Sequence, residues 1–150
     1  MLRLTRTTTE NSDFLALVAL LNKYLAELDG DEHAFYAQLN VLKQVNPAVV
    51  AYLNDEPVGC GAFRELEPGV VEVKRMFVQP AHRGLGVARA VLGELEKWAR
   101  EQRNASCVLE TGKRQPEAIR LYEKSGYVFT PKYGQYVGVE NSVCMRKKIG

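Results

Sequence analysis

The stretch HRGLGVARAVLGELEKWAR, residues 82–100, places two glycines directly in front of a regular helical pattern. Apolar residues within 88–99 recur at intervals of three and four, the spacing that puts them on one face of a helix. A β-rich run at residues 70–78 ends shortly before the glycines. Gly84 and Gly86 therefore lie at a predicted strand–turn–helix junction.

This junction has the physical properties of an anion-binding site. The first turn of a helix leaves four backbone N–H groups without partners inside the helix, and the aligned peptide dipoles add about half a positive charge there. Gly84 and Gly86 lack Cβ atoms and permit unusual φ, so a phosphate can approach the amides, and Arg83 supplies a full charge. The junction predicts a phosphate site; a merely flexible turn is the alternative for Gly-Leu-Gly alone.

Two other phosphate-site patterns do not fit. The P-loop pattern GxxxxGK[ST] is absent from the chain. The dinucleotide fingerprint needs a third glycine, which Val87-Ala88-Arg89 does not offer, and an acidic residue about twenty positions further on. Glu110 ends a predicted strand, but its distance from Gly86 fits that pattern poorly.

Outside the junction, the chain alternates between strand and helix patterns. Period-two runs and turn signals predict strands, and apolar residues three and four apart predict helices. The expected elements are strands at 2–6, 48–53, 58–66, 70–78, 106–111, 127–130 and 142–148, and helices at 14–28, 35–46, 87–100 and 115–126, with a hairpin turn at Asn54-Asp55-Glu56-Pro57. This βααβββαβαββ order predicts an α/β fold with a mixed, partly antiparallel sheet and helices on both faces.

Composition narrows the class of protein. The 150 residues suit one domain, 1–150, and no apolar run is long enough to span a bilayer. The amino terminus lacks the order of a secretory signal, so we expect a cytoplasmic protein. The net charge of +2 does not favour nucleic acid. Cys60, Cys107 and Cys144 lie apart in apolar runs, so we expect buried side chains and no metal site.

Two ordered motifs carry a family resemblance. Arg83-Gly84-Leu85-Gly86-Val87-Ala88 follows the strand and loop KRMFVQPAH, and PEAIRLYEKSGYVF, residues 116–129, comes downstream with Ala118 and Tyr122. In these motifs the chain resembles the GNAT superfamily of acyl-CoA-dependent N-acetyltransferases, whose hallmark is (Q/R)-x-x-G-x-(G/A). The specific similarity covers roughly residues 71–129.

The resemblance implies the GNAT fold and acetyl-CoA as cofactor. In the family, amides of the glycine-rich turn hold the CoA pyrophosphate, and a bulge splays the fourth strand from the fifth so that its backbone pairs with the pantetheine arm. An amide near Val78 would stabilise the oxyanion. The cofactor-binding residues implied here are Met76, Phe77, Val78, Arg83, Gly84, Leu85, Gly86, Val87, Ala88, Ala118 and Tyr122.

Two side chains are candidates for proton transfer. An amine acceptor is mostly protonated at neutral pH and needs a base. Glu72 interrupts an apolar strand where family members often hold a base or a water-orienting acid; the alternative is a solvated charge. Tyr122 matches the tyrosine acid that protonates the departing CoA thiolate in the family, and its alternative is an aromatic packed in the core.

Two polar segments are candidates for the acceptor site. GNAT proteins choose their acceptor through the first two helices and the segment between the last two strands. His33 and Tyr36 fall in the first region and Tyr133 and Tyr136 in the second, and Glu72 is expected to join them. Such a lining suits a small polar amine or amino acid, although each residue could instead be an ordinary surface group.

Three cationic side chains near these segments have open roles. Lys74 and Arg75 could contact an acidic acceptor or only cap a sheet edge, and His82 is expected at the surface or at the phosphate rim.

The function predicted from these residues is acetyl transfer from acetyl-CoA to a primary amine by direct attack. A non-catalytic acyl-CoA sensor and an unrelated nucleotide-binding module are the competing hypotheses. The resemblance also makes a homodimer a reasonable expectation, because dimers are common in the family.

Overall fold

The computed structural model describes residues 1–29 and 44–150. Its strands are β1 (Leu2–Thr8), β2 (Pro47–Leu53), β3 (Glu56–Glu67), β4 (Val70–Val78), β5 (Ser106–Gly112), β6 (Val128–Thr130) and β7 (Ser142–Lys148); its helices are α1 (Ser12–Asp29), α3 (Val87–Glu101) and α4 (Pro116–Lys124), with short 3₁₀ turns η2 (Pro80–His82) and η3 (Gly134–Tyr136). These elements confirm the predicted order wherever the chain is described. The helix predicted at 35–46 falls mostly outside the described residues.

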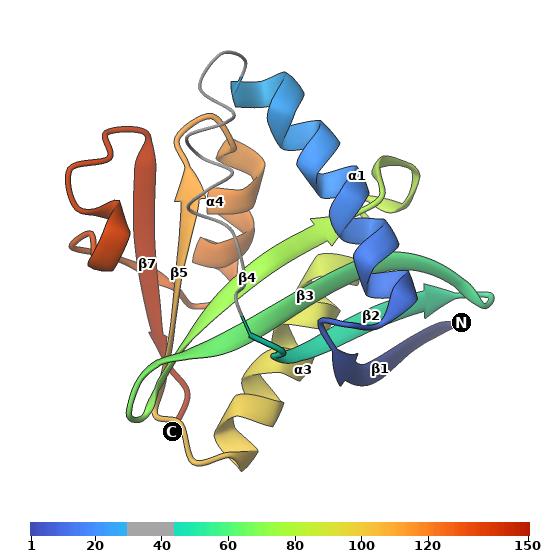
Figure 1. Ribbon diagram of the computed structural model, residues 1–150, viewed down its shortest axis with the longest axis horizontal. Helices are drawn as coiled ribbons and strands as arrows, with labels where there is room; N and C mark the ends of the chain where they lie inside the picture. The colour runs from blue at the N-terminus through green and yellow to red at the C-terminus, as the bar shows by residue number, and fades with distance from the viewer. Residues whose placement is uncertain (30–43) are drawn as a thin grey trace.

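The strands form one mixed sheet (Figure 1) in the order β1-β2-β3-β4-β5-β7-β6. Among the described strands, β4 and β5 are the one parallel pair, and the other neighbouring pairs are antiparallel. A parallel pair needs a long crossover, and α3 supplies it between β4 and β5. The predicted partly antiparallel sheet is thus confirmed.

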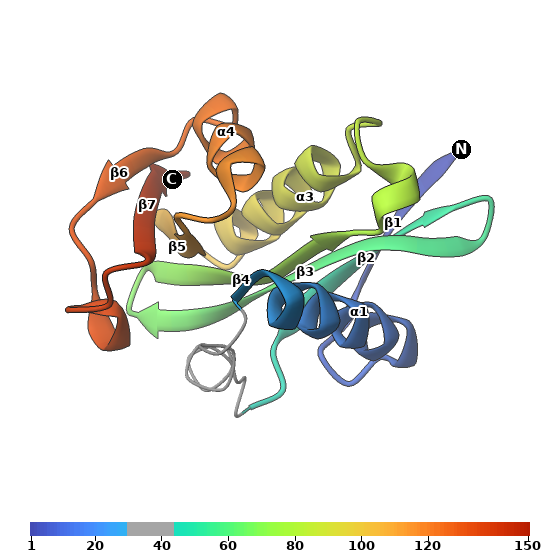
Figure 2. The ribbon, with the colours of Figure 1, turned by 90° about the horizontal axis from the view of Figure 1, so that it is seen from above.

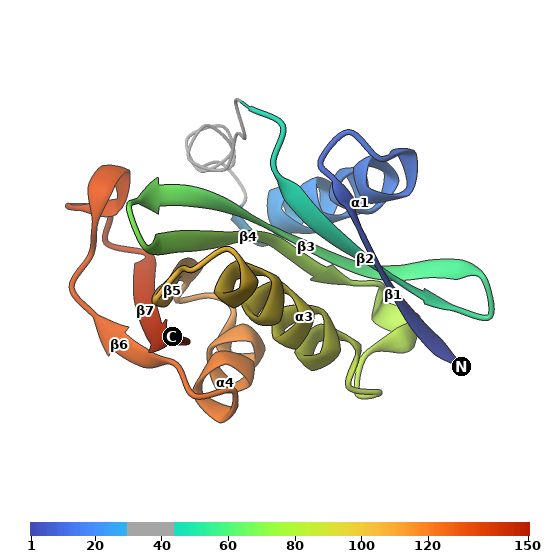
Figure 3. The same cartoon turned by 90° about the horizontal axis from the view of Figure 1, so that it is seen from below.

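Helices cover both faces of the sheet (Figures 2 and 3): α1 packs on one face, and α3 and α4 lie on the other. Two apolar clusters fill the layers. The smaller cluster joins α1 to the middle of the sheet and contains Phe14, Leu17, Leu21, Ala48, Val50, Cys60, Ala62 and Phe77. The larger includes Val91, Leu92, Leu95 and Ala99 of α3. The expected burial of all three cysteines is confirmed.

The hairpin between β2 and β3 turns more tightly than the sequence suggested. Leu53 pairs with Glu56, so only Asn54 and Asp55 form the loop, with φ of 51° and 65°. Asn and Asp tolerate this left-handed region, and a two-residue turn of this kind matches the twist of the strands. The four-residue turn that we expected is therefore wrong, because Glu56 and Pro57 already belong to β3.

A β-bulge interrupts β4 in its second half. Lys74 pairs with Ala62 and Phe77 with Cys60, which leaves Arg75 and Met76 opposite the single residue Gly61. Arg75 adopts φ of 60°, a conformation that is uncommon outside glycine. The resemblance implied a bulge in this strand beside the cofactor-binding residues Met76, Phe77 and Val78, and the structure places it at Arg75 and Met76.

Beyond Val73, β4 and β5 separate. Their parallel pairing runs from Val70 and Ser106 to Val73 and Leu109 and then stops. The strand β5 continues in register with β7 as far as Gly112. The sheet therefore opens between the ends of β4 and β5, with the bulge on one side of the gap.

Candidate active site

The glycine turn before α3 has the geometry of an anion cradle. Gly84 and Gly86 adopt φ of 82° and 79°, and Gly86 caps the helix without any side-chain hydrogen bond to the first turn. A Cβ placed on either glycine would meet no atom within 4 Å, so neither position is crowded by a neighbouring group. The left-handed backbone explains why glycine stands at both positions. Unblocked amides at the start of a fifteen-residue helix can accept a phosphate.

Arg83 connects this turn to β4 and α1. Its Nε donates to the Val78 carbonyl oxygen at 3.1 Å, and its Cζ lies 5.2 Å from the ring centroid of Tyr24. The guanidinium is therefore held near the turn that it was predicted to charge. The neighbouring His82 ring lies 3.0 Å from a Glu56 carboxylate oxygen at the surface. Its contact is thus with the β2–β3 hairpin.

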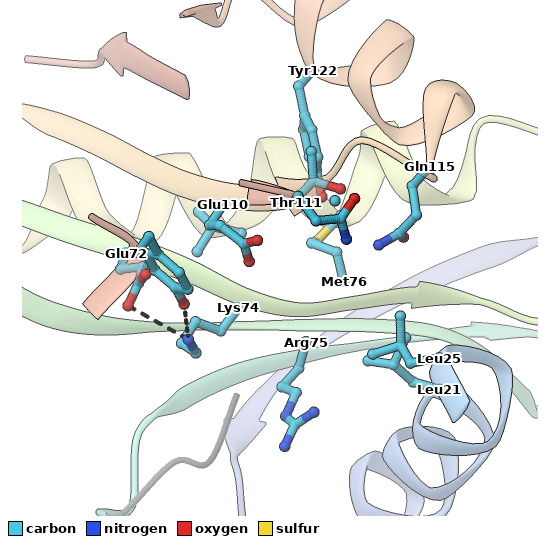
Figure 4. A pocket seen from close by; sticks show the side chains of 14 residues that line it. Leu21, Leu25, Glu72, Lys74, Arg75, Met76, Glu110, Thr111, Gln115 and Tyr122 are labelled. Atoms are coloured by element: carbon cyan, nitrogen blue, oxygen red, sulfur yellow. Dashed lines mark hydrogen bonds and ion pairs between the residues drawn. The ribbon is translucent and has the colours of Figure 1, made fainter. Parts of the chain in front are cut away.

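A cavity lies where β4 and β5 diverge (Figure 4). Side chains from α1, β4, β5 and α4 line it, together with Asn141 before β7 and Tyr136 in η3. Four of the predicted site residues lie on its wall: Glu72, Met76, Tyr122 and Tyr136. The fold thus brings residues from both halves of the chain to one opening.

Glu72 lines the cavity and is buried, with 1 % exposure. Arg64 Nε donates to its Oε1 at 2.7 Å, and the Tyr133 hydroxyl donates to its Oε2 at 2.6 Å. Lys74 Nζ lies 3.7 Å from Oε1. Each carboxylate oxygen thus already accepts a hydrogen bond, and Glu72 is a buried, paired side chain. The alternative from the sequence, a charge exposed to solvent, is therefore wrong.

Lys74 and Tyr136 form the adjacent part of this buried network. Lys74 Nζ donates to the Tyr136 hydroxyl at 2.9 Å, and both side chains are buried. Burial lowers the pKa of Lys74 and raises that of Tyr136. Lys74 therefore does not cap a sheet edge, because β4 is an inner strand of the sheet.

Tyr122 reaches from α4 toward β4 in Figure 4 and lines the cavity. The side chain is 6 % exposed. Burial, followed by the charge of Glu110, raises the pKa of its hydroxyl above the ordinary value. The hydroxyl therefore stays protonated at neutral pH, as a proton donor requires.

Glu110 is a second carboxylate on the cavity wall, and sequence reasoning did not assign it a role. It lies near the end of β5, half-buried, and accepts a hydrogen bond from Ser142 Oγ at 2.8 Å. A polar residue late in a buried parallel strand was the available signal, because ligands bind beyond the carboxyl ends of such strands.

The other predicted residues fall into distinct positions. Phe77 packs its ring in the α1-side cluster, while Val78 and Val87 pack in the larger one, with Ala88 and Ala118 against it. Leu85 is exposed on the glycine turn. Tyr133 reaches the site through Glu72. His33 and Tyr36 lie outside the described residues.

The Val78 amide faces the gap between the strands. The next amide, Gln79 N–H, donates to Val58 O on β3. Because successive residues of a strand direct their backbone groups to opposite edges, the Val78 amide points away from β3. It thus points to the side where β5 has separated from β4.

Comparison with known proteins assigns this arrangement to a family. Residues 14–127 match the Acetyltransferase (GNAT) family. The chain belongs to the GNAT acetyltransferases. It is 36 % identical over 135 residues to a protein named IAA acetyltransferase from Azospirillum brasilense, with 89 % of this chain and 88 % of that protein covered.

Solved structures share the fold of this acetyltransferase. A Klebsiella pneumoniae protein assigned to the acyl-CoA N-acyltransferases has a TM-score of 0.84 and 31 % identity, covering 100 % of this chain and 99 % of its own. PaiA N-acetyltransferase from Thermoplasma acidophilum, in complex with coenzyme A, has a TM-score of 0.69 and 14 % identity, with 99 % of each chain covered. The latter likeness concerns the fold alone.

The cofactor of the family, acetyl-CoA, fits the residues of this GNAT chain. The open, left-handed glycine turn suits the pyrophosphate, and the unpaired edge of β4 beyond Val73 offers backbone groups to the pantetheine arm. The chain is therefore an acyltransferase that uses acetyl-CoA.

Proposed function

We propose that this acetyltransferase moves the acetyl group of acetyl-CoA to the primary amine of a small polar acceptor by direct attack. The observation that supports it is that Tyr122, Glu72 and Glu110 line the same cavity at the gap between β4 and β5. An acid and a base at one opening are what amine acylation requires.

Glu110 is the general base in this proposal. Its carboxylate lines the cavity and is half-buried, whereas Glu72 is only 1 % exposed and is held by Arg64 and Tyr133. Glu72, the base proposed from sequence, then acts as a positioning residue that holds Lys74 and Tyr133. The proton of the acceptor ammonium passes to Glu110, directly or through one water.

Tyr122 is the general acid. Bound acetyl-CoA supplies a thioester, whose carbonyl carbon forms a bond to the amine nitrogen while the carbon–sulfur bond breaks. The Tyr122 hydroxyl gives its proton to the departing sulfur, which would otherwise leave as a thiolate with a conjugate-acid pKa of about 8.5. The second proton that the nitrogen loses as the amide forms returns to the Tyr122 oxygen through water, which restores the hydroxyl. The Val78 amide donates a hydrogen bond to the developing oxyanion, a contribution of about 3 kcal/mol.

The acceptor is small and polar in this proposal because the cavity wall is rich in hydrogen-bonding groups. Thr111, Gln115, Tyr136 and Asn141 lie on it. Such groups favour an acceptor with several polar atoms over a long apolar amine.

A screen of acetyl-CoA against an amine panel tests the function. CoA release should equal the amount of acetylated amine identified by mass spectrometry. Tight acetyl-CoA binding with no acetylated product from any amine would instead support the non-catalytic sensor.

Cytoplasmic location and a homodimer remain predictions. No helix within 1–29 or 44–150 is both long and apolar enough to cross a bilayer. Light scattering of the purified chain would measure the oligomeric state directly.

A further inference from the structure

Arg75 occupies an unusual position on the cavity wall. It lies at the left-handed residue of the β4 bulge, with φ of 60°. In Figure 4 its side chain extends from β4 on the side of Leu21 and Leu25, opposite Thr111 and Tyr122. A non-glycine residue in this region costs about 1 kcal/mol or more, and such strain gathers at functional sites.

The charge of Arg75 is not neutralised by the described part of the chain. Its Nη1 donates to the neutral side-chain oxygen of Asn22 at 3.0 Å, and none of the ion pairs found among residues 1–29 and 44–150 includes Arg75. The side chain of Arg75 is half-buried, and burial lowers the pKa of its guanidinium. A half-buried guanidinium with one neutral partner can still bind an anion.

The other cations near the cavity are already engaged. Arg64 bonds to Glu72 at 2.7 Å, and Lys74 bonds to Tyr136 and lies 3.7 Å from Glu72. These contacts form a closed network around Glu72. Arg75 stands outside that network, and Glu110 lies on the other side of β4 in Figure 4. The cavity wall thus carries the carboxylate of Glu110 and the guanidinium of Arg75 at separate positions.

We propose that the acceptor of this enzyme carries an anionic group, namely a carboxylate, and that Arg75 binds it. The guanidinium matches a carboxylate in a two-point hydrogen bond, while Glu110 receives the amine. Amino acids and related amino carboxylates are the acceptor class that this arrangement fits. Polycationic amines are disfavoured because Arg75 would repel their additional charges. The inference rests on the proposed function, because it names the acceptor of the same site.

Matched acceptor pairs test this inference. Serine is compared with ethanolamine, histidine with histamine, and phenylalanine with phenethylamine, so that the members of each pair differ in the carboxylate. We expect the wild-type kcat/KM to be at least about 10-fold higher for the preferred amino acid than for its partner, because a charge-assisted pair contributes on that scale. Arg75→Met should abolish this preference by raising KM for the amino acid, with KM for acetyl-CoA unchanged.

Arg103→Met provides the matched control. Arg103 also has a left-handed backbone, with φ of 66°, but it is exposed after α3 and does not line this cavity. The control should keep the wild-type preference. Equal kcat/KM within every pair, or an Arg75→Met variant that keeps the preference, would overturn the inference.

A binding measurement separates this inference from the proposed function. The N-acetyl derivatives of the same three amino acids are titrated calorimetrically into the CoA-bound protein. Binding that weakens at least about 10-fold in Arg75→Met supports the carboxylate site even if no amine is acetylated, in which case only the proposed function fails. Binding that is equal in both proteins, or absent from the wild type, overturns the carboxylate site.

Discussion

At the scale of single residues, the two cavity carboxylates have different surroundings and therefore different expected roles. Glu72 is enclosed by Arg64, Tyr133 and Lys74. Glu110 is half-buried on the cavity wall and is bonded by Ser142. Glu72 is buried among these donors and is better suited to holding its neighbours, whereas the half-buried Glu110 can reach an acceptor in the cavity.

Replacing the two carboxylates by amides tests this assignment. Glu110→Gln should lower kcat by about 100-fold, the usual size of a lost general base, with KM for acetyl-CoA unchanged. Steady-state kinetics with the preferred amine measure both. Glu140→Gln, at an exposed position before β7, is the control and should match the wild type. If Glu110→Gln kept full kcat while Glu72→Gln lost it without a lower melting temperature, the base would be Glu72.

The Tyr122 hydroxyl is expected to matter for turnover and not for folding. Tyr122→Phe should lower kcat by about 100-fold and leave acetyl-CoA affinity nearly unchanged. Tyr127→Phe is the control, because Tyr127 stacks edge-to-face on Tyr122 at 5.9 Å but does not line the cavity. An equal loss of kcat in both variants would remove Tyr122 from the chemistry.

The pH dependence of kcat follows from the same hydroxyl. Burial raises the pKa of Tyr122, so its protonated form persists beyond the ordinary pKa of about 10. The acid is therefore lost only above that range, and kcat should show no decline between about pH 7 and pH 9.5. This is measured as kcat across the pH range. A kcat that falls between about pH 7 and pH 9.5 while the protein is still folded would contradict the role of Tyr122.

Some site residues could be predicted from the sequence because they belong to the two motifs shared with the family. Tyr122 and the glycines lie in motifs with fixed spacing, and the structure places Tyr122 on the cavity wall. Glu110 and Arg64 could not be found that way, because Ser142, the partner of Glu110, and Arg64, a partner of Glu72, come from separate strands. Their contacts depend on how the sheet brings distant segments together.

At the scale of elements, the bulge in β4 is what opens the site, and Gly61 accommodates it. A Cβ on Gly61 would lie 2.5 Å from Met76 Sδ and 2.8 Å from Leu95 Cδ1. The glycine therefore lets α3 pack closely over the bulged strand. Alternating apolar residues identified the strand in the sequence, but no residue type marked the bulge, because Arg75 is unusual in left-handed backbone.

Gly61→Ala should lower the free energy of unfolding by about 1–3 kcal/mol, because an extra methyl group has no room in this core. It should also weaken acetyl-CoA binding by displacing Met76 toward the cavity. Gly93→Ala is the matched control, since Gly93 lies within α3 with nothing within 4 Å of its added Cβ. The control should gain up to about 1 kcal/mol from helix propensity. Denaturant titration measures both, and equal stability changes would rule out crowding at Gly61.

The helices and strands themselves followed closely from hydrophobic periodicity. The pattern at 87–100 corresponds to α3, Val87–Glu101, because its apolar stripe has one face of sheet to cover. Short polar turns were less predictable. The turn is formed by Asn54 and Asp55, which both adopt left-handed backbone. Glu56 and Pro57, which follow, made the turn look longer in the sequence than it is.

At the scale of the whole molecule, Arg6 ties the amino-terminal edge of the sheet to the crossover helix. Arg6 of β1 donates to Glu94 at 2.7 Å and to both oxygens of Glu101 at 2.7 and 3.0 Å. Its guanidinium also lies 5.1 Å from the centroid of the Trp98 ring. These contacts raise the pKa of Arg6, with the Glu101 hydrogen bond as the largest cause.

Arg6→Met should therefore lower the free energy of unfolding by about 1 kcal/mol, because the pair is networked and partly shielded from water. The difference from wild type should shrink at 1 M salt, where charges are screened within about 3 Å. Arg120→Met is the control, since its pair with Glu117 spans 3.9 Å between exposed side chains. Chemical denaturation of all three proteins gives the comparison. A loss in Arg120→Met as large as that in Arg6→Met would refute the ranking of the two pairs.

The central claim is that one gap in the sheet joins a diphosphate cradle at α3 to an acylation site beside Tyr122. A crystal structure of the chain with bound acetyl-CoA measures this most directly. The pyrophosphate oxygens should lie about 3 Å from amides of the Gly84–Ala88 turn, and the thioester oxygen should lie at the same distance from the Val78 amide. A pyrophosphate away from the α3 turn, or a thioester outside the gap between β4 and β5, would contradict the claim.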